Sequence, residues 1–349
     1  MFLSTKPKKI FVDFGDHVVL LARTSTDIPP FVVEDVRECV PGDETALAEA
    51  LEALQPKKSP NGLIHANCAV YTPKRVVRRL PLDIKRMKES TYLNELVTQQ
   101  LRINPDQYSL ALLNPSDGTE YDIAKASQKD AVFCGFPSDD IVAFQERLLT
   151  AGLYPEAIEM GTVAGVGALV DYLAFNQIKT PVLMLEIDAD ATYSFIVTSA
   201  GLETSRPISQ GLETMIPVVQ NELGLKDAES ARKLFLSNAF DFTGMGATLI
   251  KKLLKELQSF IGFYEVQTGQ SISHVVCTIL PSKLVWIEEA IATQLGVVVL
   301  KTNMPDWLQS RQITLADSLS GTVQDARRFG LFGLMAQYAN HVSSTEKTQ

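Results

Sequence analysis

The chain has 349 residues, of which 46% are hydrophobic and 21% are charged, a composition typical of a folded globular protein. At about 150 residues per domain, this length predicts two domains. The formal net charge of −9 at pH 7 argues against a nucleic acid or an anionic membrane surface as the main partner, because both attract a basic face.

The predicted elements begin with a β-hairpin over residues 9–24, KIFVDFGDHVVLLART. Its β-branched and aromatic residues flank a short turn that contains Gly and Asp, which is typical of a hairpin. Residues 61–83 are strand-like, with a turn around Thr72 and Pro73, and continue the first sheet. The next elements are a helix and two strands, over residues 84–102, 109–114 and 130–137.

A helix is then predicted over residues 138–153, SDDIVAFQERLLTAGL. Ser138 is placed to cap the free amides of its first turn. Gly152 lies near its end, where a residue with positive φ is often needed. A further helix over residues 164–175 closes the first lobe.

The pattern of the first hairpin recurs over residues 181–208, where an apolar strand reaches an acidic turn and a second strand begins. A duplicated lobe is the simplest explanation. A long helix is predicted over residues 247–267, because apolar residues recur there at intervals of three and four. The other elements are amphipathic stretches over 212–223 and 227–237, strands over 272–280 and 297–301 around a helix over 284–295, and a terminal helix over 326–340.

An Asp- and Gly-bearing turn between two strands, once in each lobe, is how the actin, hexokinase and heat-shock ATPase superfamily holds nucleotide phosphates. Within this superfamily the chain resembles the PilM family of cytoplasmic actin-like proteins in type IV pilus machines, and more distantly the cell-division family FtsA. The stretches that carry the resemblance keep the family's order and approximate spacing. They are VDFGDHVVLLA, RRLPLD (78–83), TAGLYPEAIEM (150–160), LMLEIDADATYSFIV, TSRPISQG (204–211), KDAESARKLF (226–235) and LVWIEEAIATQLGVVV (284–299).

The resemblance implies an α/β fold, a duplicated actin-like (ribonuclease H-like) two-lobed fold with an inserted subdomain in the first lobe. The implied parts are a first lobe over 1–79, 160–178 and the C-terminal helix 326–340, an inserted α/β subdomain over 80–159, a second lobe over 179–211 and 271–325, its helical outer subdomain over 212–270, and a disordered polar tail over 341–349.

The first hairpin departs from the family pattern at positions that would meet phosphates. Asp13 and Gly15 match the family. The small hydroxyl residues and the lysine usual after that glycine are replaced by Asp16, His17 and Leu20 or Leu21.

The second hairpin and the adenosine-binding turn depart as well. The family's Asp-Ile-Gly-Ala becomes an acidic stretch that contains Glu186 and Asp188, with Asp190 close behind. A carboxylate about 4 Å from a phosphate charge costs on the order of 4 kcal/mol at an effective dielectric constant near 20. TILPSK (278–283) stands where the family has a Gly-Gly turn, and Pro281 removes an amide donor.

The chain is therefore predicted to be a pseudo-ATPase without catalytic residues and without a cofactor. The alternative is an ATP-binding actin-like enzyme, in which Asp13 and Glu186 lie near a bound Mg²⁺. The degenerate nucleotide cleft comprises Asp13, Gly15, Asp16, Glu186, Asp188, Asp190, Gly211 and Pro281. A second interpretation of its acids is a Ca²⁺ or Mg²⁺ site with ligands from both lobes. We favour turn acids that face solvent, because turns are rich in Asp, and expect no metal.

The resemblance implies a partner, the cytoplasmic N-terminal tail of a PilN-like single-pass inner-membrane protein. In the family this peptide lies between the first lobe and its inserted subdomain, here roughly residues 80–160, and contact with a pilus ATPase is also implied. The sequence-level candidates for the peptide-facing region are Lys74, Arg75, Arg78 and Arg79. The alternative for this basic cluster is a solvated surface that balances acidic neighbours.

We expect a cytoplasmic protein that is peripheral to the inner membrane through its partner and is not itself inserted. The four cysteines are widely spaced and show no CxxC pair, which favours free thiols in a reducing compartment. The N-terminus reaches charge after three apolar residues, unlike a signal peptide, and no run of about 18 apolar residues appears. An FtsA-like filament protein is the other alternative, but such proteins usually end in an amphipathic helix, whereas this chain ends in polar SSTEKTQ.

Overall fold

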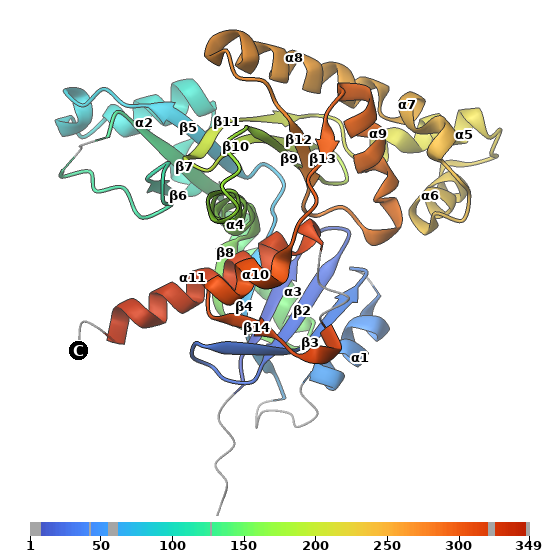
Figure 1. Cartoon of the computed structure of the whole chain (residues 1–349), viewed down its shortest axis with the longest axis horizontal. Coiled ribbons are helices and arrows are strands. Elements are labelled where there is room, and N and C mark those ends of the chain that lie inside the picture. Colours follow the sequence, from blue (N-terminus) through green and yellow to red (C-terminus); the bar gives the residue numbers. More distant parts are fainter. Residues whose placement is uncertain (1–7, 42, 55–61, 126–127, 320–324, 347–349) are drawn as a thin grey trace, which may run out of the picture.

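The computed structural model describes residues 8–41, 43–54, 62–125, 128–319 and 325–346, the last six of these by their backbone alone. Its strands form sheets of six, five and three strands. We call the six-stranded and the five-stranded sheets, with the helices that cover them, the first and the second lobe. Figure 1 shows the first lobe at the bottom and the second at the upper right, with helix α4 (Gly161–Phe175) seen end-on between them.

The sheet of the first lobe has the order β14-β3-β2-β1-β4-β8. Its strands are β1 (Ile10–Phe14), β2 (Val19–Thr24), β3 (Phe31–Cys39), β4 (Ile64–Val70), β8 (Leu153–Met160) and β14 (Ile313–Leu315). All five residues of β1 are buried, because helices cover both faces. Val12 belongs to the core beneath α1 (Glu44–Leu54) and α3 (Ser138–Thr150), whereas Phe11 belongs to the core beneath α4 and α11 (Phe329–Glu346).

The sheet of the second lobe has the order β11-β10-β9-β12-β13. Its strands are β9 (Val182–Ile187), β10 (Thr192–Thr198), β11 (Gly201–Ile208), β12 (His274–Cys277) and β13 (Val298–Val299). Every residue of β9 and β10 is buried. One face packs on outer helices, namely α5 (Ile216–Glu222), α6 (Ala228–Ser237), α7 (Gly246–Leu249), α8 (Lys251–Thr268) and α9 (Trp286–Leu295).

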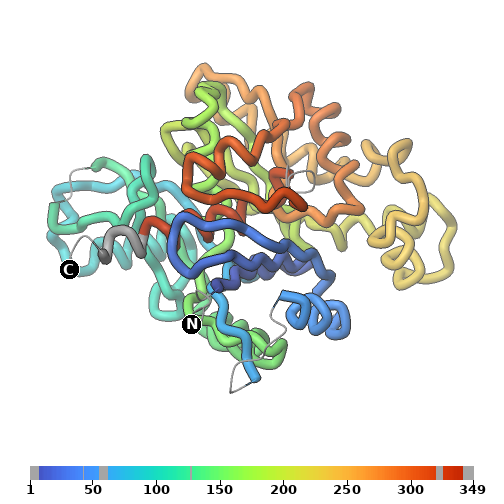
Figure 2. Tube along the Cα trace, turned by 60° about the horizontal axis from the view of Figure 1, so that its bottom comes forward, coloured from blue at the N-terminus to red at the C-terminus, as the bar shows by residue number. Residues whose placement is uncertain are grey.

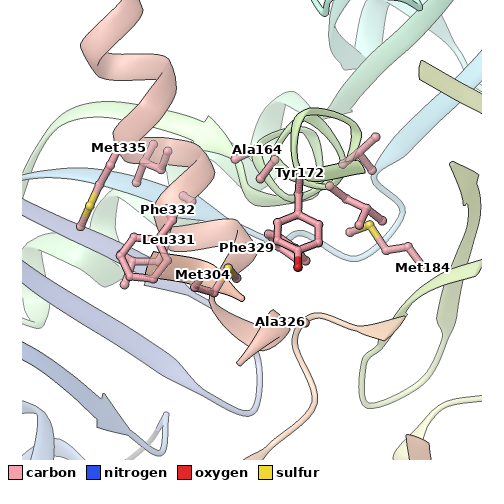
Figure 3. Close-up of a cluster of buried hydrophobic side chains, with 14 of the residues drawn as sticks. Ala164, Tyr172, Met184, Met304, Ala326, Phe329, Leu331, Phe332 and Met335 are labelled. Atoms are coloured by element: carbon pink, nitrogen blue, oxygen red, sulfur yellow. The ribbon is translucent and has the colours of Figure 1, made fainter. Parts of the chain in front are cut away.

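Helices α4 and α11 pack against each other between the two large sheets, and Figure 3 shows this shared core. Tyr172 of α4 meets Phe329 of α11 edge to face, with ring centroids 5.4 Å apart. Met184 of β9 reaches the same core from the second lobe. The two helices approach closely, since a Cβ added at Gly333 would lie 2.2 Å from the carbonyl oxygen of Ala164. The central helix pair therefore joins the lobes through apolar packing.

The three-stranded sheet forms a small separate unit beside α4, and Figure 2 shows its cyan and teal trace projecting from the rest of the molecule. Its strands are β5 (Val76–Pro81), β7 (Asp130–Pro137) and β6 (Tyr108–Leu113), in that order across the sheet. With α2 (Tyr92–Leu96) it has its own apolar core, which includes Leu80, Tyr92 and Phe133.

The structure confirms the two predicted hairpins, because β1 pairs antiparallel with β2 and β9 with β10. Gly152 has the expected positive φ, 86°. The prediction for Ser138 is wrong: it is the first residue of α3, and no side chain caps that helix start. The long helix predicted over 247–267 is interrupted at the buried Ile250 and forms α7 and α8.

The single helix predicted over residues 84–102 is also wrong. The segment contains a 3₁₀ turn, α2 and a π-helical turn over Val97–Leu101. Its buried residues Met87, Tyr92 and Val97 are five positions apart, and a regular α-helix does not place such residues on one face. The chain therefore changes its winding to keep all three in the small core.

The structure tests the predictions for the two ends of the chain only in part. Helix α11 runs to Glu346, past residue 341 where a disordered tail is predicted. The predictions for residues 1–7 and 347–349 concern positions outside the described ranges. Within the described part of the chain, no helix combines the length and the apolarity needed to cross a membrane.

Candidate functional site

A buried polar cluster joins the two lobes where β1 and β9 end. Asp13 of β1 is 4% exposed, Glu186 of β9 is 0% exposed, and Asp188, which follows β9, is 5% exposed. The hypothesis that the cleft acids are turn residues that face solvent is therefore wrong for these three. It holds for Asp190, which is exposed.

The guanidinium of Arg75 lies at the centre of this cluster. Its Nη1 donates to Asp188 Oδ2 at 2.6 Å, its Nη2 to Glu186 Oε2 at 2.9 Å, and its Nε to the Thr162 hydroxyl at 2.8 Å. The Thr162 hydroxyl in turn donates to the same Glu186 oxygen at 2.7 Å. The side chain of Arg75 has no exposed surface. A cation from the first lobe is thus enclosed by two carboxylates of the second.

Two tyrosines line the same site. The ring centroid of Tyr193 is 3.7 Å from the guanidinium carbon of Arg75, and that of Tyr71 is 5.4 Å away. The Tyr71 hydroxyl is hydrogen-bonded to Asp13. The space around Tyr71 is tight, because a Cβ added at Gly161 would lie 2.3 Å from its ring. Protein atoms therefore surround the guanidinium.

Burial governs the proton affinities in the cluster. It raises the pKa of Asp13 to about 7, helped by the nearby charge of Glu186 and opposed by the Tyr71 hydrogen bond. It also raises the pKa of Glu186, although Arg75 counteracts this. Burial alone would lower the pKa of Arg75, but the carboxylates of Asp188 and Glu186 outweigh it and raise that pKa. The site thus retains a permanent cation.

One backbone amide in each of the two hairpin turns is engaged within its own hairpin. The amide of Gly15 donates to the carbonyl of Val18 at 3.0 Å, and that of Asp188 donates to the carbonyl of Ala191 at 2.9 Å. A Cβ added at Gly211 would lie 2.3 Å from the carbonyl oxygen of Ala189. Gly211 is therefore required for packing against the second turn.

Two further residues predicted for the cleft, Asp16 and Pro281, are only partly buried. Asp16 is half-buried, and burial and the charge of Asp188 raise its pKa. Pro281 is partly exposed, and Leu280 beside it is buried. In the described ranges, no group of three or more His, Cys, Asp or Glu side chains is arranged as a metal site requires. Glu186 and Asp188, which the metal hypothesis includes, instead bind Arg75.

A chain of a solved PilM–PilN type IV pilus biogenesis complex has a similar structure, with a TM-score of 0.65 and 16% sequence identity over 95% of this chain and 98% of that chain. This chain has the two-lobed actin-like fold. The predicted fold class and the PilM-like resemblance are thereby confirmed. No family model and no curated protein matches the sequence.

Two other solved structures match less well. The ethanolamine utilization protein EutJ from Carboxydothermus hydrogenoformans has a TM-score of 0.45 and 13% identity, over 95% of this chain and 90% of that chain. The cytoplasmic domain of EpsL, an inner-membrane component of the type II secretion system of Vibrio cholerae, has a TM-score of 0.35 and 10% identity, over 61% of this chain and 75% of that chain.

A groove of about 750 Å³ lies where the three-stranded sheet meets α4 and α11 of the actin-like core. Its larger apolar lining residues are Val77, Leu113, Val132, Val163, Val166, Val170, Leu202 and Trp307. A smaller hollow of about 270 Å³ continues it and shares Leu113, Cys134, Val163 and Gln337 with it. The resemblance implies a partner peptide between the first lobe and an inserted subdomain over residues 80–159. The structure corrects these bounds, because α3 and β8 belong to the first lobe and the three-stranded sheet begins at Val76.

None of the four basic residues predicted to face the partner lines this groove. Arg75 is enclosed in the polar cluster and cannot contact a partner in this structure. Arg79 forms an ion pair with Asp130, with its Nε 2.5 Å from Asp130 Oδ2. Its Nη1 is 3.5 Å from Glu203 Oε2, on β11 of the second lobe. Lys74 is exposed and Arg78 is half-buried.

Sequence reasoning missed the role of Arg75 because seven basic residues crowd positions 74–88, and such clusters usually lie on the surface. One signal was present. Glu186 and Asp188 extend a strand that is otherwise wholly apolar, and two acids there require a cation. The sequence does not indicate which of the basic residues supplies it.

Proposed function

We propose that this chain is a cytoplasmic PilM-like adaptor that binds no nucleotide and docks the cytoplasmic tail of an inner-membrane pilus or secretion assembly protein. The observation that carries the proposal is the position of Arg75. An arginine that bridges the two hairpins occupies the place where this fold otherwise positions phosphates and a metal ion. The chain thus supplies an internal positive charge to the acids of the cleft.

Electrostatics and access support the loss of nucleotide binding. If the Arg75 side chain moved out of the cluster, the negative charges of Asp188 and Glu186 would repel an incoming phosphate. That movement would also leave two buried carboxylates without an ion-pair partner, which is energetically costly. The side chains of the cluster have almost no exposed surface, so a triphosphate reaches none of them without a rearrangement of both lobes.

Shape and topology support docking in the groove. Its volume lies within the range of about 300–1,000 Å³ that ligand pockets commonly have, and its walls are largely apolar. The similar PilM structure was solved as a complex with PilN. A groove between the core and a small sheet also leaves the rest of the surface free for other components of the machine.

Isothermal titration calorimetry with ATP and Mg²⁺ tests the first half of the proposal. We expect no heat of binding up to millimolar nucleotide for the intact chain. Micromolar binding would overturn the pseudo-ATPase assignment and favour the nucleotide-using alternative.

A glycine substitution in the groove tests the second half. Gly167 lies on the exposed side of α4 and lines the groove, and a Cβ there meets only Gln337, at 3.8 Å, so Gly167→Phe introduces a bulky side chain into the groove from a position where the first carbon fits. The control is Gly262→Phe on α8, where a Cβ meets nothing within 4 Å. The probe is a peptide that copies the cytoplasmic tail of a single-pass membrane protein encoded beside this gene. We expect Gly167→Phe to weaken binding at least tenfold and the control to leave it unchanged; equal binding by both variants would refute docking here.

A further inference from the structure

The charged side chains along the groove are predominantly acidic. Asp117, Glu120 and Asp171 line the larger hollow, and Glu159 lines the smaller one. Arg311 is the one cationic side chain among the described residues that line the two hollows. The groove thus carries a net charge of −3, from four acids and one base.

The single cation is already neutralised within the chain. Arg311 Nε lies 2.7 Å from Asp171 Oδ2, and the indole N–H of Trp307 donates to the same oxygen at 2.8 Å. This pair fixes one end of the groove and offers no uncompensated positive charge to a ligand. The acids at the rim of the groove are Asp117 and Glu120, which are exposed.

The apolar walls are accessible beside this acidic rim. Leu113 of β6 and Val163 and Val170 of α4 are each only partly buried, and they face the groove. Gln337 and Asn340 of α11 add side-chain amides, which are able to donate hydrogen bonds to a peptide backbone and to accept them from it. The lining therefore combines apolar contact, amide hydrogen bonding and negative charge.

We infer that the groove selects a peptide segment that carries apolar side chains next to positive charge, from Lys, Arg or a free amino terminus. This inference rests on the proposed docking function and specifies the chemistry of the partner. Charge complementarity favours a cationic segment and penalises an acidic one. Cytoplasmic segments next to membrane spans are enriched in Lys and Arg, so the tail of an inner-membrane protein has the required chemistry. The overall net charge of −9 acts in the same direction.

A display library of random 12-residue peptides, panned on the intact chain and on Gly167→Phe, tests the inference without a known partner. We expect the intact chain, and not the variant, to enrich peptides with apolar residues and net positive charge. Enrichment of acidic or uncharged peptides would overturn the inference and leave docking intact. If both proteins enrich the same peptides, or neither enriches any, the docking function itself fails and the inference with it.

The strongest enriched peptide then allows a direct test of the rim by fluorescence anisotropy. Asp117→Asn with Glu120→Gln removes two charges, and the Asn oxygen still accepts the hydrogen bond from the Thr119 amide. The control pair is Asp139→Asn with Glu146→Gln, exposed residues of α3 outside the groove. We expect the rim pair to weaken binding about 3- to 10-fold at low salt, less at 0.5 M salt, and the control to have no effect. An unchanged affinity for the rim pair would refute the inference.

Discussion

Replacing Arg75 with methionine should destabilise the protein substantially. Methionine retains much of the side-chain volume but leaves Glu186 and Asp188 buried without a cation. Removal of one member of a buried ion pair costs about 3–5 kcal/mol. At about 2.1 cal/mol/K per residue, 349 residues give an unfolding entropy of about 0.7 kcal/mol/K, so the expected fall in Tm is about 4–7 °C.

Differential scanning calorimetry at pH 7 measures this change. The matched control is Arg78→Met, three positions further along, where the side chain is half-buried and lies outside the cluster. A point substitution that breaks no buried ion pair typically costs about 1 kcal/mol, so the control should lower Tm by about 1–2 °C, less than Arg75→Met.

A triple variant separates the charge from the packing. Arg75→Met combined with Glu186→Gln and Asp188→Asn removes the whole charged set, so no buried charge is left without a partner. The triple variant should therefore recover most of the lost Tm. A single variant within 1 °C of wild type, or a triple variant as unstable as the single one, would refute the assignment of Arg75 as the cation that this cleft requires.

Three further predictions follow from the same cluster. The pKa of Asp13 is about 7 in the folded protein and 3.8 in the unfolded chain, so its contribution to stability is full below about pH 4 and is lost as the pH rises to 7. Asp13→Asn should therefore flatten this pH dependence and stabilise the protein at pH 8, by an amount on the order of 4 kcal/mol at most. Urea titrations across pH measure this change. Gly161→Ala should lower the urea midpoint clearly, whereas Gly244→Ala should not, because only the first Cβ meets the Tyr71 ring. Arg75→Met should weaken peptide binding in the groove without lining it, which anisotropy with the peptide of the docking test would detect.

Much of the fold was predictable because its pattern is local. The two hairpins carry strong strand propensity around acidic turns, and both form as expected. The broken segment around Tyr92 was not predictable from helical spacing, since a small core of its own determines its winding. Tertiary packing there overrides the local signal.

The candidate site was predictable in its members and not in its chemistry. Asp13, Glu186 and Asp188 come together as the resemblance to PilM implies. Their state depends on a residue more than 100 positions away from the second hairpin, and no local pattern distinguishes Arg75 from the basic residues around it. A burial or pairing signal of this kind arises only when the chain is folded, because it is a property of the contact between two lobes.

The position of the cluster also determines what it holds in place. Arg75 immediately precedes β5, and Thr162, which binds its Nε, lies in the first turn of α4. Strand β5 and helix α4 both line the groove, through Val77 and Val166. The guanidinium therefore connects β5 and α4 to β9 of the second lobe. Because this cation is a side chain of the protein itself, it cannot dissociate as a bound ligand does, and under the proposed docking function we expect the groove to bind its partner without a nucleotide signal.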